Sequence, residues 1–133
     1  MIALDTSFIV SYYNEKDENH NKALDIMREI LADNYGEVCI SDYIFDECAT
    51  VILVRLKDLE KTINICDKIK QVILFNIDEE IFDSAWNLFK NQKETLFSFT
   101  DCTTLALMEK ENIKNIATFD KDFKKIKEIN VIG

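Results

Sequence analysis

Short apolar runs alternate with longer helical patterns along the chain, and this alternation is the feature that most constrains its fold. Between the runs, apolar residues recur at the three-to-four spacing of amphipathic helices. The expected strands cover residues 2–5, 38–40, 72–77, 115–118 and 130–132, and the expected helices cover about 8–13, 20–34, 42–56, 59–71, 78–89, 98–112 and 121–127. Strands joined through helices form right-handed crossovers and a parallel sheet covered on both faces. The sequence therefore predicts an α/β fold.

The chain has 133 residues, the length of one ordinary domain, and contains no repeat, low-complexity linker or proline. We therefore expect a single domain, 1–133. Charged residues interrupt every apolar stretch, so no run is long enough to span a bilayer. The N-terminus reaches Asp5 after four residues and lacks the basic start of a signal peptide. These features predict a cytoplasmic protein without a membrane partner.

The cysteines and the single histidine argue against several kinds of site. The four cysteines form neither a CxxC pair nor a zinc-finger pattern, and we expect Cys39, Cys48 and Cys66 to be reduced core residues. Cys102 follows Asp101, but a catalytic thiol there would need a base. His20 lies outside the expected strand ends, which disfavours a Ser/His/Asp triad. The chain also lacks the glycine-rich loop of the nucleotide-binding P-loop.

The formal net charge of −9 disfavours a nonspecific nucleic-acid clamp, since such proteins are usually basic. It permits an enzyme whose acids surround a divalent ion, because bound metal reverses the local charge. Many of the acids are expected to be solvated, since they occupy polar faces or helix starts. These are Asp17, Glu18, Asp78, Glu79, Glu80, Glu109 and Glu111.

Three other acids lie where a parallel sheet binds ligands, at the carboxyl ends of its strands. Asp5 closes the first expected strand, and Asp120 follows the fourth. Asp101 lies three residues after Ser98, in the first turn of an expected helix whose N-terminus would face the same rim. Each position also suits a helix-capping role, for which aspartate is favoured. Position alone leaves both interpretations open.

Glu47 is harder to explain as a surface residue. Its neighbours at helical spacing, such as Ile44 and Val51, are apolar, and no basic residue lies within one helical turn. A buried glutamate needs a partner, because removing its charge from water is costly. A cation shared with the other acids would supply one. Mg²⁺ and Mn²⁺ prefer oxygen ligands and promote phosphodiester hydrolysis. The sequence thus predicts a phosphodiesterase with a metal site formed by Asp5, Glu47, Asp101 and Asp120.

Four short motifs in this order resemble those of the PIN domain family. They are Asp5-Thr6-Ser7, the segment from Ser41 to Glu47, Ser98-Phe99-Thr100-Asp101, and Ala117-Thr118-Phe119-Asp120. Each motif is weak alone, but the similarity extends over essentially the whole chain. The resemblance implies a Rossmann-like three-layer α/β/α fold with a central parallel sheet.

The resemblance also implies function. PIN domains are Mg²⁺- or Mn²⁺-dependent endoribonucleases, and the motifs match Asp5, Glu47, Asp101 and Asp120 to the family's metal-binding acids. Ser7 and Thr118 match the hydroxyl positions that orient an acid or a water. PIN proteins of this size resemble VapC toxins, which are typically homodimers inhibited by a VapB antitoxin. The implied products of RNA cleavage carry a 5′-phosphate and a 3′-hydroxyl.

Other interpretations remain open. The fourth acid is Asp120 or Asp122, and Thr118, two residues earlier, favours Asp120. Two further functions are an RNA-processing PIN nuclease without an antitoxin and a PIN-like module that binds RNA or protein without cleaving. A receiver domain would place a second acid beside Asp5, and a haloacid-dehalogenase phosphatase would place an aspartate at Ser7. Both are disfavoured.

Two groups of side chains are candidates for RNA contact. Lys121, Lys124 and Lys125 follow Asp120 and would either hold the RNA backbone or form a solvated helix face. Tyr12 and Tyr13 would either stack on a base or pack in the core.

Overall fold

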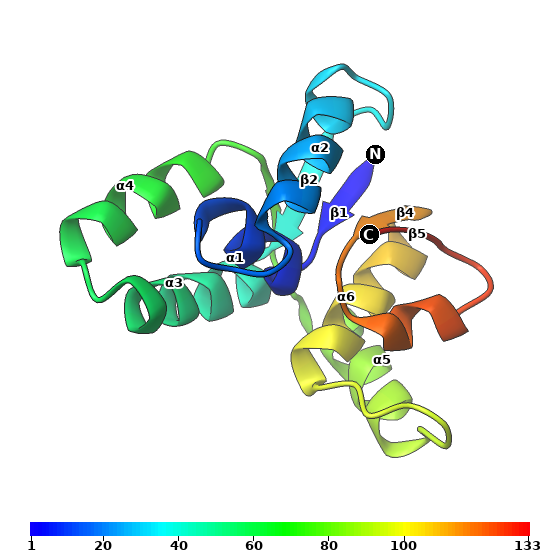
Figure 1. Ribbon diagram of the computed structural model, residues 1–133. Helices are drawn as coiled ribbons and strands as arrows, with labels where there is room; N and C mark the ends of the chain where they lie inside the picture. The colour runs from blue at the N-terminus through cyan, green and yellow to red at the C-terminus, as the bar shows by residue number, and fades with distance from the viewer.

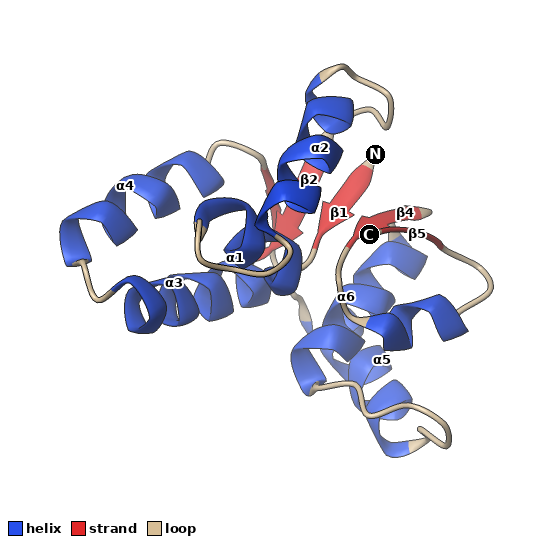
Figure 2. Ribbon diagram, in the orientation of Figure 1, coloured by secondary structure: helices blue, strands red, loops and turns tan.

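A computed structural model describes all residues, 1–133, and shows one five-stranded parallel sheet in the order β3-β2-β1-β4-β5. The strands are β1 (Ile2–Leu4), β2 (Val38–Ser41), β3 (Ile73–Phe75), β4 (Asn115–Ala117) and β5 (Asn130–Ile132). β1, the first strand in the chain, is therefore the central strand of the sheet (Figure 2). The predicted α/β fold class is confirmed.

Six α-helices and one short 3₁₀ helix connect and cover the strands (Figure 1). They are α1 (Thr6–Tyr13), α2 (His20–Leu31), α3 (Asp42–Leu56), α4 (Leu59–Ile69), α5 (Glu79–Lys90), α6 (Phe99–Lys110) and the 3₁₀ helix η1 (Lys121–Lys125). Capping side chains begin several of them, because the first N–H groups of a helix lack internal partners. Ser41, Asp58, Asp78 and Ser98 each accept such a bond.

The two faces of the sheet belong to two separate apolar clusters. Side chains alternate along a strand, so Ile2 and Leu4 of β1 face one cluster and Ala3 faces the other. The first cluster joins β1 and β2 to α1, α2, α3 and α4, and the second joins the sheet to α5, α6 and η1. Figures 1 and 2 show these two groups of helices on opposite sides of the strands. The fold is thus the three-layer α/β/α arrangement that the family resemblance implied.

The secondary structure departs from the sequence prediction mainly at element ends. The first strand stops at Leu4, so Asp5 follows the strand instead of closing it. The basic segment after Asp120 is a 3₁₀ helix of five residues, not a helix through residue 127. All four cysteines are free. Cys39 and Cys48 are buried, as predicted for core residues, whereas Cys66 is only partly buried, and Cys102 is buried as well. No helix has the length and apolar character needed to cross a membrane.

Strand register determines which residues meet at the carboxyl edge of the sheet. Leu4 of β1 pairs with Ala117 of β4, so the next residues, Asp5 and Thr118, are neighbours. α6 leads into the amino end of β4, and its first turn therefore lies at the same carboxyl edge. Helices α1 and α3 begin there too, directly after β1 and β2.

Phe8 tests how much the first cluster contributes to stability. It is fully buried, and its ring lies 5.9 Å from that of Phe119, which follows β4. Phe8→Ala is expected to lower the free energy of unfolding by about 3–5 kcal/mol, because it removes a buried ring and leaves a cavity. Chemical denaturation measures the change. Leu96→Ala is the control, since Leu96 is 95% exposed. A similar loss for the two variants would contradict this account of the core.

Candidate active site

A cleft of about 540 Å³ opens at the carboxyl edge of the sheet, and all four predicted acids line it. Asp5 comes from the end of β1, Glu47 from the second turn of α3, Asp101 from the first turn of α6, and Asp120 from the segment after β4. Ser7, on α1, lines the same cleft. The structure therefore brings together acids that are up to 115 residues apart in the chain.

Asp5 is held at the bottom of the cleft by two hydroxyl groups. It is only 4% exposed, and its Oδ2 accepts hydrogen bonds from Ser7 Oγ and Thr118 Oγ1, each at 2.7 Å. Although Asp5 precedes α1, its side chain makes no capping hydrogen bond to that helix. The helix-cap interpretation considered for Asp5 is therefore wrong.

The same two hydroxyls orient the segment that carries Asp120. Ser7 Oγ accepts a hydrogen bond from the Phe119 N–H, and Thr118 Oγ1 accepts one from the Asp120 N–H, both at 3.0 Å. Each hydroxyl thus donates to Asp5 and accepts from the backbone of this segment. Ser7 and Thr118 thus fix the Asp5 carboxylate relative to the segment that carries Asp120.

Asp101 has the structural role considered for it from sequence, and it also faces the cleft. Its Oδ2 accepts from the Ser98 N–H at 2.9 Å, and its own N–H donates to Ser98 Oγ at 3.1 Å. This is a complete capping box. Only one carboxylate oxygen is used by the cap, so the other is available to a ligand in the cleft.

Glu47 is half-buried and makes no hydrogen bond or ion pair. It lies on a face of α3 that continues through Val51 to Arg55, all of which line the cleft. Arg55, the basic residue on this face, lies about two helical turns beyond Glu47, so no basic side chain lies within one turn of the glutamate, as the sequence indicated. Its partial exposure shows that the glutamate is less deeply buried than the apolar flanks suggested.

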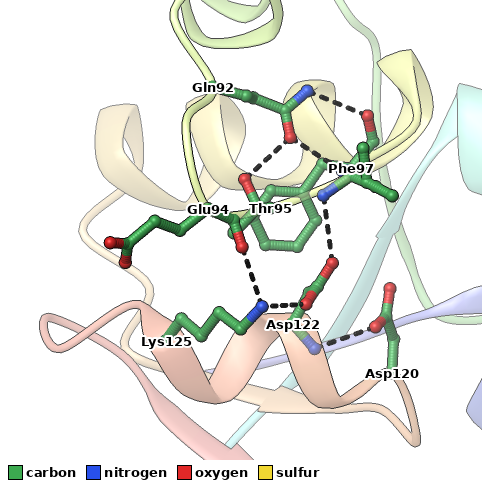
Figure 3. A network of polar contacts seen from close by, with 8 residues as sticks. Gln92, Glu94, Thr95, Phe97, Asp120, Asp122 and Lys125 are labelled. Atoms are coloured by element: carbon green, nitrogen blue, oxygen red, sulfur yellow. Dashed lines mark hydrogen bonds and ion pairs between the residues drawn. The ribbon is translucent and has the colours of Figure 1, made fainter.

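Asp120 and Asp122 have different surroundings. Asp122 Oδ1 pairs with Lys125 Nζ at 2.7 Å, and its Oδ2 accepts from the Leu96 N–H at 3.1 Å, so both oxygens are engaged outside the cleft. Figure 3 shows this carboxylate turned toward the loop before α6. Asp120 lines the cleft and uses Oδ1 to accept from the Asp122 N–H. The structure therefore favours Asp120 as the fourth acid of the site.

Three of the four acids share one pattern: one oxygen is anchored and the other accepts no hydrogen bond. The free oxygens are Oδ1 of Asp5, Oδ1 of Asp101 and Oδ2 of Asp120, and Glu47 has both oxygens free. Free carboxylate oxygens on fixed side chains suit a hard divalent cation. The chain contains no group of three or more such side chains already close enough to hold an ion. The acids line the cleft without forming a closed coordination shell.

Burial and mutual repulsion determine the protonation of this site. Burial raises the pKa of Asp5, hydrogen bonds from Thr118 and Ser7 oppose that effect, and the charge of Asp120 adds to it. Burial, and then the charge of Asp5, raise the pKa of Asp101 to about 6. Both carboxylates are therefore harder to ionise than free aspartate, which a nearby cation would reverse.

The other candidate RNA contacts lie outside the cleft. Lys124 Nζ donates to the Gly133 carbonyl, and Lys125 Nζ donates to the Glu94 carbonyl as well as pairing with Asp122. Lys121 is exposed and also does not line the cleft. Tyr12 and Tyr13 pack against the first apolar cluster, which matches their core interpretation. RNA contact by the three lysines stays a prediction.

Sequence reasoning missed three charged residues of the cleft, Asp17, Glu18 and Arg55. Asp17 was expected to be solvated, but its side chain is only 14% exposed. Its Oδ1 accepts from Ser11 Oγ and the Asn19 N–H, which fixes the carboxylate at the rim. The position of Asp17 in the cleft depends on the loop after α1 lying near α3, which the sequence does not indicate. For Arg55, the spacing of eight residues after Glu47 on one helix was an available signal.

The PIN domain family profile matches residues 2–129. The chain belongs to the PIN domain family. Among curated proteins, it is 27% identical over 124 residues to the 23S rRNA-specific endonuclease VapC20 of Mycobacterium tuberculosis, covering 92% of each chain. The sequence resemblance to the PIN domain is thereby confirmed.

Solved structures share this PIN fold. The crystal structure of M. tuberculosis VapC20, described as a sarcin-ricin loop cleaving toxin, has a TM-score of 0.84, 24% identity and full coverage of both chains. VapBC2 from Rickettsia felis, solved with a promoter DNA fragment, has a TM-score of 0.71 and 18% identity, over 98% of this chain and 97% of that one. FitAcB from Neisseria gonorrhoeae has a TM-score of 0.69 and 16% identity, over 100% and 97%.

Asp101 is expected to make the stability of the PIN domain depend on pH. Because its folded-state pKa of about 6 exceeds the ordinary value of 3.8, the folded chain binds this proton more tightly, and stability falls as pH rises from about 4 through 6. Asp101→Asn keeps an acceptor for the Ser98 N–H and removes the charge. In EDTA, the variant is expected to melt at a higher temperature than the unaltered chain at pH 8, with the difference vanishing near pH 4.

Thermal melts across this pH range measure the effect. Asp46→Asn is the matched control, since Asp46 is an exposed acid on α3 outside the cleft. If Asp101→Asn melts at a lower temperature at pH 8, the repulsion argument is wrong.

Proposed function

We propose that this PIN domain is a Mg²⁺- or Mn²⁺-dependent endoribonuclease and the toxin of a VapC-type toxin–antitoxin pair. The observation that carries the proposal is that Asp5, Glu47, Asp101 and Asp120 all line one cleft, each with at least one carboxylate oxygen that accepts no hydrogen bond. Membership of the PIN family and similarity to the rRNA endonuclease VapC20 support the choice of RNA as substrate.

The four acids would hold the divalent ion, which when bound supplies charge neutralisation at the phosphodiester and an activated water. The chain's own contribution is orientation. Ser7 and Thr118 hold Asp5 through one oxygen, and the capping box holds Asp101 through one oxygen. These hydrogen bonds fix both side chains before a ligand arrives, so less side-chain ordering is needed on binding, which lowers its entropic cost. Attack in line with the leaving 3′-oxygen would leave a 5′-phosphate.

RNA cleavage in the presence and absence of EDTA tests this activity. Purified protein is expected to cut RNA with Mg²⁺ or Mn²⁺ and to stop in EDTA. Asp5→Asn should abolish cleavage while the fold remains, since it removes a charge with little change in volume. A natural first substrate is ribosomal RNA, the target named for VapC20.

Asp122→Asn is the matched control, because Asp122 is a neighbouring acid whose two oxygens contact Lys125 and Leu96 instead of the cleft. It should retain cleavage within a few-fold. Full activity of Asp5→Asn, or activity unaffected by EDTA, would refute the proposed site.

The proposed biological unit is a homodimer bound by a VapB-type antitoxin. The structural neighbours include VapBC2 from R. felis and a toxin–antitoxin complex from Klebsiella pneumoniae. The candidate self-association surface is one face of α5, where Phe82, Trp86 and Phe89 are 38–47% exposed. Their rings surround Phe99 of α6 at centroid distances of 5.0–6.3 Å. An exposed aromatic cluster of this kind is typical of protein interfaces.

Trp86→Glu is expected to convert the dimer into a monomer, because it places a charge in the proposed apolar interface. Light scattering after size-exclusion chromatography should give twice the 15.5 kDa chain mass for the unaltered protein and a single chain mass for the variant. Leu31→Glu, at an exposed apolar position on α2, should stay dimeric. An unaltered chain that is monomeric at high concentration would rule out this interface.

A further inference from the structure

Arg55 is the single basic residue in a cleft that contains six acids. The acids are Asp5, Asp17, Glu18, Glu47, Asp101 and Asp120. Arg55 lies in the last turn of α3, on the same face as Glu47 and Val51. Eight residues of helix separate Arg55 from Glu47 by about 12 Å along the axis. Its guanidinium would therefore contact a different part of a bound RNA from the part that contacts the four acids.

The guanidinium of Arg55 lies near the Asp17 carboxylate but makes no hydrogen bond to it. Its Nη1 lies 4.0 Å from Asp17 Oδ2, beyond hydrogen-bond distance, and the side chain is 54% exposed. Asp17 is itself fixed through its other oxygen, by Ser11 and Asn19. The donors of Arg55 thus remain free for an incoming anion. Guanidinium groups bind phosphate oxygens in a bidentate manner.

Arg55 also lines a second hollow, of about 230 Å³, that none of the six acids of the cleft lines. There Lys16 and Lys61 accompany it, together with the acids Glu15 and Asp58. The balance of charge thus differs between the two, with one base, Arg55, among six acids in the cleft, and the same Arg55 with Lys16 and Lys61 against two acids in this hollow. A polyanion bound in the acidic cleft would be attracted to the bases of this hollow where it extends beyond the cleft.

We infer that Arg55 is a phosphate-binding residue that grips the RNA backbone beside the acidic part of the cleft and directs it toward Lys16 and Lys61. The inference rests on the proposed ribonuclease function and deepens it. Arg55 contributes binding at a phosphate other than the one that is cut. It is a positioning residue for the reaction, and its removal weakens binding of every RNA sequence to the same extent.

Binding of a fluorescein-labelled single-stranded RNA to the non-cleaving variant Asp5→Asn tests the inference without relying on activity. Adding Arg55→Gln is expected to raise the Kd about tenfold, the loss typical of one charge-assisted contact. It should also reduce the slope of log K against log salt by about 0.7, the value for one phosphate contact on a single strand. Arg55→Lys keeps the charge but loses the bidentate geometry, so its Kd should lie between the two.

Arg28→Gln is the matched control. Arg28 is the only other arginine in the chain, is exposed on α2, and lies outside the cleft. In this variant of Asp5→Asn, both the Kd and the salt slope should match those of the Asp5→Asn parent. Lys16→Gln combined with Lys61→Gln should weaken binding and lower the slope as Arg55→Gln does. Equal Kd and slope for Arg55→Gln and Arg28→Gln would overturn the inference.

Kinetics of the otherwise unaltered chain separate a binding role from a catalytic one. Arg55→Gln should raise KM for RNA about tenfold and leave kcat within a few-fold, because the contact is equal in ground and transition states. A large fall in kcat at unchanged KM would overturn the assignment to a phosphate that is not cut. RNA binding without cleavage would refute the proposed function alone, and the Arg55 comparison would still stand. Failure of Asp5→Asn to bind RNA, with no cleavage by the unaltered chain, would refute both.

Discussion

The anchoring of Asp5 at the end of the central strand is the interaction on which the rest of the site depends. A carboxylate that is 4% exposed is costly to ionise, and two hydroxyl donors, Ser7 and Thr118, compensate part of that cost. The donors are 111 residues apart in the chain, and they are 3.2 Å apart in the structure. Because each also accepts from the backbone before η1, the position of Asp120 follows from the position of Asp5.

The cost of this arrangement is visible in the protonation of the site. The chain keeps Asp5 and Asp101 in surroundings that raise both pKa values, although the fold alone would be more stable without these charges. Enzymes commonly retain such destabilising groups at their active sites. The capping box of Asp101 partly offsets the cost, since one carboxylate oxygen stabilises α6 while the other stays free. The cap thus uses only one of the two oxygens of this side chain.

Local sequence predicted the features that depend on chain neighbours. The strand and helix alternation predicted the sheet, and the carboxyl-end rule placed Asp5, Asp101 and Asp120 at one rim, where the cleft contains them. What the sequence could not give depends on distant contacts. The Asp122 carboxylate is engaged by the Leu96 backbone, 26 residues away, and no local pattern signals that contact.

Asp17 also depends on contacts that the local sequence does not indicate. In sequence it lies in a polar stretch beside Glu18, which resembles a solvated turn. The loop after α1 lines the cleft, and its Asp17 carboxylate accepts a hydrogen bond from Ser11 and lies near Arg55 of α3. Burial of a loop residue depends on which element packs over it, and periodicity does not report that. A pattern of residue types therefore predicted the acids that follow strands and missed those brought in by a loop.

The distribution of charge along α3 bears on how an acidic protein could bind the proposed RNA substrate. A net charge of −9 repels a polyanion at long range, but this field is screened beyond about 8–10 Å at physiological salt. Binding therefore depends on the charges within the cleft and directly beside it. Glu47 near the start of α3 and Arg55 at its end place a carboxylate and a guanidinium on one rigid helix face. Because the helix fixes the separation of Glu47 and Arg55, it would also fix the distance between a cation held by the acids and a phosphate held by Arg55. Overall acidity is thus compatible with the proposed RNA substrate, since the local arrangement of charges, and not the net charge, would determine which part of an RNA the protein contacts.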